Sequence, residues 1–150
     1  MPIIDDRTTN YSYAKPNVAN TLQADVARLR SALDDIDGDL ARMAGYETGQ
    51  GGAVTQATSR TTGVEINKRC GAITLVSAAG STSWQSFTVT NSLVAATDVI
   101  ALSQKSGTDL MMMHVTAVAA GSFQISFATT GGTTTEQPVI SFAVIKAVAA

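Results

Sequence analysis

A run of apolar residues spaced alternately by four and three positions constrains this chain more than any other feature of its sequence. This alternation is a heptad repeat, in which the apolar residues occupy the a and d positions. The seven residues, which we call the heptad stripe, are Leu22, Val26, Leu29, Leu33, Ile36, Leu40 and Met43. A stripe this narrow is typical of a helix that packs against partner helices, so the sequence predicts self-association.

The residues within the repeat indicate how many helices associate. Leu33 at a followed by Ile36 at d favours three or four helices, whereas Val26 at a favours two. Asp25 at g and Arg30 at the following e attract one another across a parallel interface. We therefore expect a short parallel trimeric coiled coil, with each chain contributing one helix to a homotrimer.

The expected coiled-coil stalk spans residues 17–45, with Asn17 or Asn20 able to cap the start of the helix. The alternative is one amphipathic helix of a globular bundle. The chain contains no second helical pattern against which such a helix would pack. This absence favours the coiled coil.

Residues 1–16 show neither helical nor strand periodicity and end in a Lys-Pro pair, where proline disfavours helix at the residue before it. We expect an extended arm. Its apolar and aromatic residues are of the kind that anchor protein interfaces, and they are Ile3, Ile4, Tyr11 and Tyr13. The alternative is a frayed terminus.

The composition of the chain changes after the expected helix. Residues 46–53 are rich in glycine and predict a flexible joint, and residues 54–150 consist of short runs rich in β-branched and aromatic residues. The strands expected there are Val54–Ser59, Gly63–Asn67, Ala72–Ser77, Gln85–Thr90, Asp98–Gln104, Leu110–Val118, Ser122–Ala128 and Val139–Val148. Eight short strands predict an antiparallel β-sandwich or jelly-roll-like domain, so the fold class is mainly β with an N-terminal helix.

Two strands indicate how this domain packs. Phe123, Ile125 and Phe127 alternate with polar residues and are expected to face the core together. The run Val139–Val148 is apolar on both faces. In a domain of this size, a strand with two apolar faces suggests that its second face meets another subunit.

Charge and hydropathy exclude several classes of partner. Residues 1–50 carry eight acidic and five basic residues, and residues 51–150 carry four acidic and five basic residues. No basic stripe follows from this distribution, so nucleic acid is not an expected partner. The polar, acidic start and the lack of a long apolar run predict a protein made in the cytoplasm without membrane insertion.

The sequence offers little support for catalysis, and we expect no enzyme, no cofactor and no metal site. His114 is the only histidine and Cys70 the only cysteine, so one chain cannot build a multi-histidine or cysteine-based metal centre. His114 is expected to share a strand face with Leu110 and Met112, as a packed or surface imidazole. A metal held by three copies of His114 around a trimer axis is a remote alternative.

Two single residues have a functional and a structural interpretation. Cys70 follows Lys68 and Arg69, and neighbouring positive charge activates a thiol, so it is the candidate for an intermolecular disulfide. The alternative, which we favour, is a small buried residue before a strand. Trp84, the only tryptophan, can stack on a sugar, but packing in the core or between subunits is the more usual role.

Five sequence segments of the β region are distinctive: GGAVTQATSRTTGVEINKRCGAITL, SFTVTNS, ATDVIALSQKSG, VTAVAAGSFQISF and VISFAVIKAVAA. Together they resemble a β-domain at the C-terminal end of tailed-bacteriophage structural proteins. The leader DRTTNYSYAKPNVANTLQADVARLRSALDDID is similar to the N-terminal region of phage tail-fibre and related appendage proteins. The resemblance implies a homotrimeric virion protein whose arm attaches to other virion proteins and whose β-domains project from a helical stalk.

Two functions follow from this resemblance. In the first, the protein is a short fibre or a decoration or collar protein of the phage head, neck or tail. In the second, it is a receptor-binding tip whose loops at residues 103–108 or 129–137 recognise a host cell-surface glycan. Those loops are rich in Thr, Ser and Gly and poor in aromatic residues, and the stalk is short for a fibre, so we expect the first function.

Overall fold

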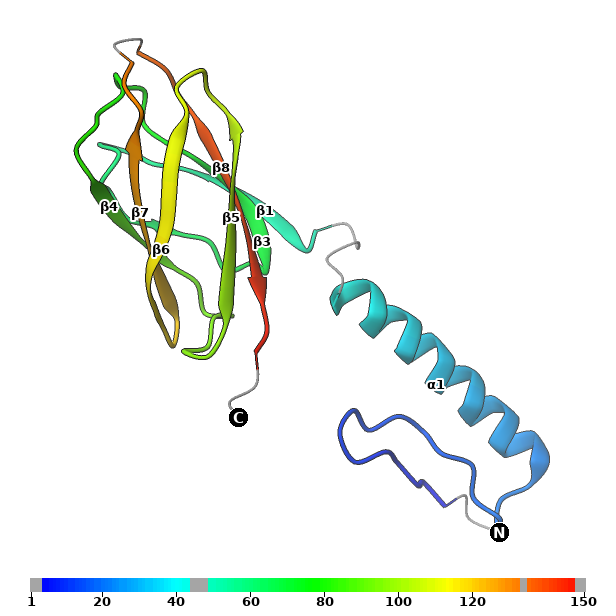
Figure 1. Cartoon of the computed structure of the whole chain (residues 1–150). Helices are drawn as coiled ribbons and strands as arrows, with labels where there is room; N and C mark the ends of the chain where they lie inside the picture. The colour runs from blue at the N-terminus through cyan, green and yellow to red at the C-terminus, as the bar shows by residue number, and fades with distance from the viewer. Residues whose placement is uncertain (1–3, 44–48, 133–134, 148–150) are drawn as a thin grey trace. The chain divides into compact units, whose positions relative to one another are not determined.

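A computed structural model describes residues 4–43, 49–132 and 135–147 of the chain, without the side chains of residues 41–43. The chain divides into two compact units, Met1–Glu47 and Thr48–Ala150, and each is described by itself. The first unit contains the single helix of the described residues, and the second contains eight strands (Figure 1). The expected class, mainly β with an N-terminal helix, is confirmed.

Helix α1 spans Leu22–Met43 and therefore coincides with the heptad stripe. It begins five residues later than the stalk expected at residue 17. Thr21 is the capping residue, because its Oγ1 accepts a hydrogen bond from the backbone N–H of Ala24 at 3.3 Å. Asn17 instead closes a turn of its own, in which its side-chain oxygen accepts from the N–H of Ala19 at 3.0 Å.

The segment before α1 is a hairpin, so the prediction of an extended arm is wrong for the described residues. Arg7 and Ala14 form an antiparallel bridge. The N–H of Thr8 donates to the carbonyl of Tyr13 at 2.9 Å, which satisfies backbone groups that an extended arm would leave to water. Ser12 lies at the turn with a φ of 56°, a left-handed conformation that lets the chain reverse.

The second unit consists of two four-stranded sheets (Figure 1). The first sheet has the order β1-β3-β8-β5 and the second sheet has the order β2-β4-β7-β6. The strands are β1 (Gly51–Thr55), β2 (Val64–Glu65), β3 (Cys70–Thr74), β4 (Gln85–Thr90), β5 (Val99–Ser106), β6 (Met111–Ala119), β7 (Ser122–Thr129) and β8 (Val139–Ile145). Each expected strand has a counterpart: β4 has the expected ends, and each of the other strands has at least one end shifted by one or more residues.

Two strand pairs differ from the antiparallel arrangement that the sequence predicts. β1 pairs with β3 in parallel, and β2 pairs with β4 in parallel. The chain passes from the first sheet to the second and back between successive strands, because β1 and β3 belong to one sheet and β2 and β4 to the other. β3 therefore runs in the same direction as β1, and β4 runs in the same direction as β2. Both sheets contain parallel and antiparallel pairs.

Two glycines expected in the flexible joint belong instead to β1. Gly51 pairs with Cys70 and Gly52 pairs with Gly71. A Cβ added at Gly71 would lie 2.6 Å from the carbonyl oxygen of Gly52 and 2.9 Å from Cδ1 of Ile66. Glycine at position 71 therefore allows β1, β3 and the segment after β2 to approach closely.

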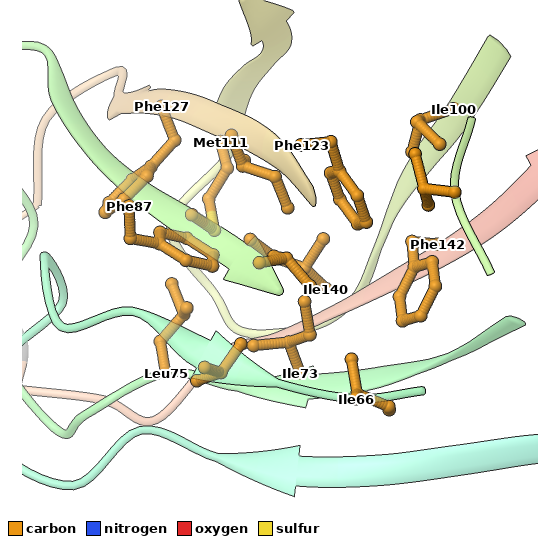
Figure 2. Close-up of a cluster of buried hydrophobic side chains, with 14 residues drawn as sticks. Ile66, Ile73, Leu75, Phe87, Ile100, Met111, Phe123, Phe127, Ile140 and Phe142 are labelled. Atoms are coloured by element: carbon orange, nitrogen blue, oxygen red, sulfur yellow. The ribbon is translucent and has the colours of Figure 1, made fainter. Parts of the chain in front are cut away.

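The core lies between the two sheets (Figure 2). Phe123, Ile125 and Phe127 are fully buried on one face of β7, which confirms the alternation expected for this strand. From the opposite sheet come Ile140 and Phe142 of β8, and the rings of Phe123 and Phe142 lie 5.5 Å apart between centroids. These contacts join the two sheets into one domain.

The outer face of β8 is only partly covered in the single chain. Val139 and Ala143 are half-buried there, and Ile145 is exposed. Val148, the last residue of the expected strand, lies outside the described residues, and β8 ends at Ile145. The expectation that this face meets another subunit stays a prediction.

Candidate functional site

The heptad stripe is uncovered in the single chain. The six members with described side chains are between 39% and 82% exposed, and they are Leu22, Val26, Leu29, Leu33, Ile36 and Leu40. Met43 is part of α1, but its side chain lies outside the described residues. Burial of a large aliphatic side chain contributes about 1.5–3 kcal/mol, so this face has a strong tendency to associate.

The hairpin packs on a different face of α1, and Arg28 is the centre of the contact. The guanidinium of Arg28 donates to the carbonyl of Asp6 at 2.7 Å and to the carbonyl of Lys15 at 3.1 Å, so it joins both arms of the hairpin. Its Nη1 also lies 2.8 Å from Oδ1 of Asp5. The Arg28 side chain is only 12% exposed, which makes these charge-assisted hydrogen bonds a firm attachment.

A further hydrogen bond extends the attachment along the helix. Ala14 of the segment before α1 and Ala32 of α1 are also both buried. The hydroxyl of Tyr13 donates to Oδ2 of Asp39 at 2.7 Å. This hydrogen bond to a carboxylate raises the pKa of Tyr13 to about 12, because it stabilises the protonated phenol.

The helix residues that contact the hairpin occupy the c and g positions of the heptad, beside the heptad stripe. They are Asp25, Arg28 and Asp39, each of which hydrogen-bonds to the segment before the helix. The hairpin therefore covers a flank of α1 and leaves the a and d positions open. One helix carries two separate contact faces.

Asp25 has a role that differs from the one expected. Its carboxylate accepts hydrogen bonds from the N–H of Asn17 at 3.1 Å and from Nδ2 of Asn20 at 3.0 Å. Nε of Arg28 lies 3.7 Å away. Asp25 thus bonds to the connection between the hairpin and α1 of its own chain. Its expected attraction to Arg30 of a neighbouring copy stays a prediction.

The proposed anchor residues differ in their availability. Tyr11 is 60% exposed and stacks on Tyr13 at 5.6 Å between ring centroids. The side chain of Ile4 is exposed, while its backbone N–H donates to Oδ1 of Asn20 at 2.9 Å. Ile3 lies outside the described residues, so Ile4 and Tyr11 are the members of the set that present open apolar surface.

Cys70 is a free, half-buried cysteine at the start of β3. Its register partners are Gly51 of β1 and Ala143 of β8, so it lies within the first sheet rather than in a loop. An intermolecular disulfide at Cys70 stays a prediction.

Trp84 and His114 lie together, a relationship that sequence reasoning missed. Their rings are 5.5 Å apart between centroids and tilted by 39°. Trp84 is 54% exposed, so it does not lie in the domain core, and its expected alternative, packing between subunits, stays a prediction. His114 is exposed on the same face as Leu110 and Met112, as expected from strand alternation.

Within residues 4–43, 49–132 and 135–147, no group of three or more His, Cys, Asp or Glu side chains is arranged to hold a metal ion. No helix in that part combines the length and the hydropathy needed to cross a membrane.

Comparison with known proteins finds no family model, no curated protein and no solved structure that matches this chain.

Proposed function

We propose that this protein is a non-enzymatic structural component of a bacteriophage virion that assembles into a homotrimer through α1. The observation that supports this most is the open heptad stripe on a helix whose neighbouring flank is already occupied. In this assembly the a and d residues of three copies meet along a common axis. The hairpins stay outside that axis, on the c and g flank of each helix.

The occupied flank strengthens the case for association between copies. The segment adjoining α1 on its N-terminal side is fastened through Arg28 and Tyr13, so it does not cover the stripe. Identical helices are the natural cover, because every copy carries the same heptad spacing. The pairing of Leu33 with Ile36 favours three helices over two.

The resemblance to phage appendage proteins supports the virion as the location. In this proposal the trimer is a short fibre or a decoration or collar protein, bound to other virion proteins of the head, neck or tail. Ile4 and Tyr11 are the described residues best suited to anchor it, because both side chains are exposed in the segment before α1. Aromatic side chains such as Tyr11 are frequent anchors of interfaces.

Incorporation into particles tests the anchor. A chain lacking residues 1–16 is expected to form a trimer that is absent from purified virions. Tyr11→Ala is expected to reduce incorporation, and Thr9→Ala, an exposed position in the same turn, serves as the matched control. Normal incorporation of the truncated chain would contradict the anchoring role.

The second candidate, a receptor-binding tip that recognises a host glycan, receives no support from the loops first considered for it. The turn that follows β5 borders a hollow of about 300 Å³, lined by Gln104, Lys105, Ser106, Gly107, Thr108 and Leu110. None of these residues is aromatic, and residues 129–137 contain no aromatic residue either. A glycan-binding function would need another surface of the β-domain.

A further inference from the structure

Two buried side-chain oxygen atoms of the second unit have no hydrogen-bond partner. They are Oδ2 of Asp109, in the connection between β5 and β6, and Oγ1 of Thr129, the last residue of β7. Thr129 as a whole is only 2% exposed. A buried oxygen without a donor or a cation beside it destabilises the fold, so each of these atoms needs an explanation.

The two oxygens converge on a space that a glycine leaves open. A Cβ added at Gly80 would lie 2.5 Å from Oδ2 of Asp109 and 2.7 Å from Oγ1 of Thr129. It would also lie 2.9 Å from the carbonyl oxygen of Gly131. Gly80 is not among the glycines with positive φ, so its backbone conformation does not require glycine. What glycine provides at position 80 is room between three oxygen atoms.

Hydrogen bonds of neighbouring groups hold these oxygens in position. The N–H of Asp109 donates to the carboxylate of Glu136 at 3.1 Å, and its carbonyl accepts from Nε2 of Gln104 at 2.8 Å. The N–H of Thr129 donates to the carbonyl of Ser81 at 2.8 Å, which brings the end of β7 beside the segment that contains Gly80. The β5–β6 connection and the end of β7 lie at the same end of the second unit (Figure 1). The cluster is therefore built before any ligand binds.

The chemistry of the three oxygens suits a hard cation. They belong to a carboxylate, a hydroxyl and a backbone carbonyl, which are all ligands that Ca²⁺ accepts, and Ca²⁺ tolerates irregular geometry better than Mg²⁺. No lysine or arginine of the described residues forms an ion pair with Asp109. The prediction of no metal site considered only His114 and Cys70 as ligands, and neither residue belongs to this cluster.

We infer that Asp109, Thr129 and Gly131 bind one calcium ion. Ca²⁺ takes about six to eight oxygen ligands, so water completes its coordination on the side of the half-buried Gly131. With a single carboxylate among the ligands, the dissociation constant is expected to be weak, about 1 mM. The ion joins the β5–β6 connection to the end of β7. The inference does not rest on the proposed virion function or on trimer formation, because every ligand belongs to one chain.

Thermal unfolding of the full chain with added calcium tests the inference. The chain is first freed of metal with EDTA and dialysed, and unfolding is followed by the fluorescence of Trp84, the only tryptophan, which lies in the second unit. CaCl₂ at about ten times the expected dissociation constant should raise the midpoint by about 5 °C relative to NaCl of the same ionic strength. MgCl₂ should raise it less. No rise with calcium, or an equal rise with magnesium, would overturn the assignment.

Two variants of nearly unchanged shape locate the site. Asp109→Asn and Thr129→Val each remove one ligand, so both are expected to lose the rise with calcium. Without calcium, Thr129→Val is expected to be at least as stable as the wild type, because it removes an unpartnered buried oxygen. Asp34→Asn on α1 and Thr90→Val on β4 change exposed residues and are the matched controls, which keep the rise.

The same variants decide against the inference if it is wrong. A rise with calcium that survives either Asp109→Asn or Thr129→Val would place the ion elsewhere. A Thr129→Val variant less stable than the calcium-free wild type would indicate a direct hydrogen bond from Thr129 to Asp109, which also contradicts the site. Unchanged circular dichroism establishes that the variants fold. Gly80→Ala, which fills the space between the oxygens, provides a further test and is expected to lose the rise.

Discussion

The hydroxyl of Tyr13 donates a 2.7 Å hydrogen bond to Oδ2 of Asp39, across 26 residues of sequence. Together with the contacts of Arg28, this bond holds the N-terminal hairpin along the flank of α1. The hairpin and the heptad stripe therefore occupy separate faces of one helix. This separation leaves the heptad stripe exposed while the hairpin is docked on the same helix.

The Tyr13 hydrogen bond predicts a response to alkaline pH. Its pKa is raised from 10.0 to about 12, so the bond stabilises the docked hairpin fully below pH 10, and this stabilisation is lost as pH rises through 12. In an absorbance titration of phenol ionisation, Tyr13→Phe is expected to remove the last step of the wild-type curve. Tyr11→Phe is the control and is expected to keep that step. A last step that survives Tyr13→Phe would contradict the assignment.

Arg28 is expected to hold the hairpin in place. Arg28→Met removes its charge-assisted hydrogen bonds to Asp6 and Lys15 and should weaken docking by about 2 kcal/mol. Hydrogen exchange is the measurement, and faster exchange is expected at the N–H groups of Thr8 and Lys15, which are bonded within the hairpin. Arg30→Met, at an exposed position of α1, is the matched control. Equal protection of the hairpin in both variants would show that Arg28 does not carry the contact.

Gly71 is expected to tolerate no side chain. Gly71→Ala places a methyl group 2.6 Å from the carbonyl oxygen of Gly52, so β1 must move, at a cost of about 1–3 kcal/mol in the free energy of unfolding. Gly51→Ala is the matched control, because its methyl group would lie 3.6 Å from Sγ of Cys70, an ordinary contact distance. Denaturant unfolding measures both variants. Equal stability of the two would mean that the close approach of β1 and β3 is not as described.

Leu33 tests the heptad stripe itself. Leu33→Asp places a charge at an a position, where assembly would bury it without a partner, so the trimer is expected to dissociate. Ser31→Asp adds the same charge at the exposed f position of α1 and is expected to leave the trimer intact. Size-exclusion chromatography with light scattering separates the outcomes. Dissociation by both variants would indicate a general effect of charge on the helix rather than a specific seam.

Periodicity predicted the parts of this chain in which local sequence and burial agree. The spacing of the heptad stripe located α1, and alternation identified Phe123, Ile125 and Phe127 as core residues. Both ends of β4, at Gln85 and at Thr90, were also predicted. These features depend on neighbouring residues, which a sequence displays directly.

The remaining features depend on residues far apart in the sequence. The parallel pairing of β1 with β3 follows from the order in which the chain visits two sheets, which alternation within a strand does not encode. The hairpin depends on Arg28 reaching the carbonyls of Asp6 and Lys15, and backbone acceptors have no sequence signature. Trp84 and His114 meet only through the register of β4, β7 and β6.

Sedimentation equilibrium of the full chain at micromolar concentration tests the central claim most directly. We predict a folded species with three times the mass of one chain, because six exposed residues of the heptad stripe are buried when three helices associate. A stable, folded monomer at this concentration would contradict the account.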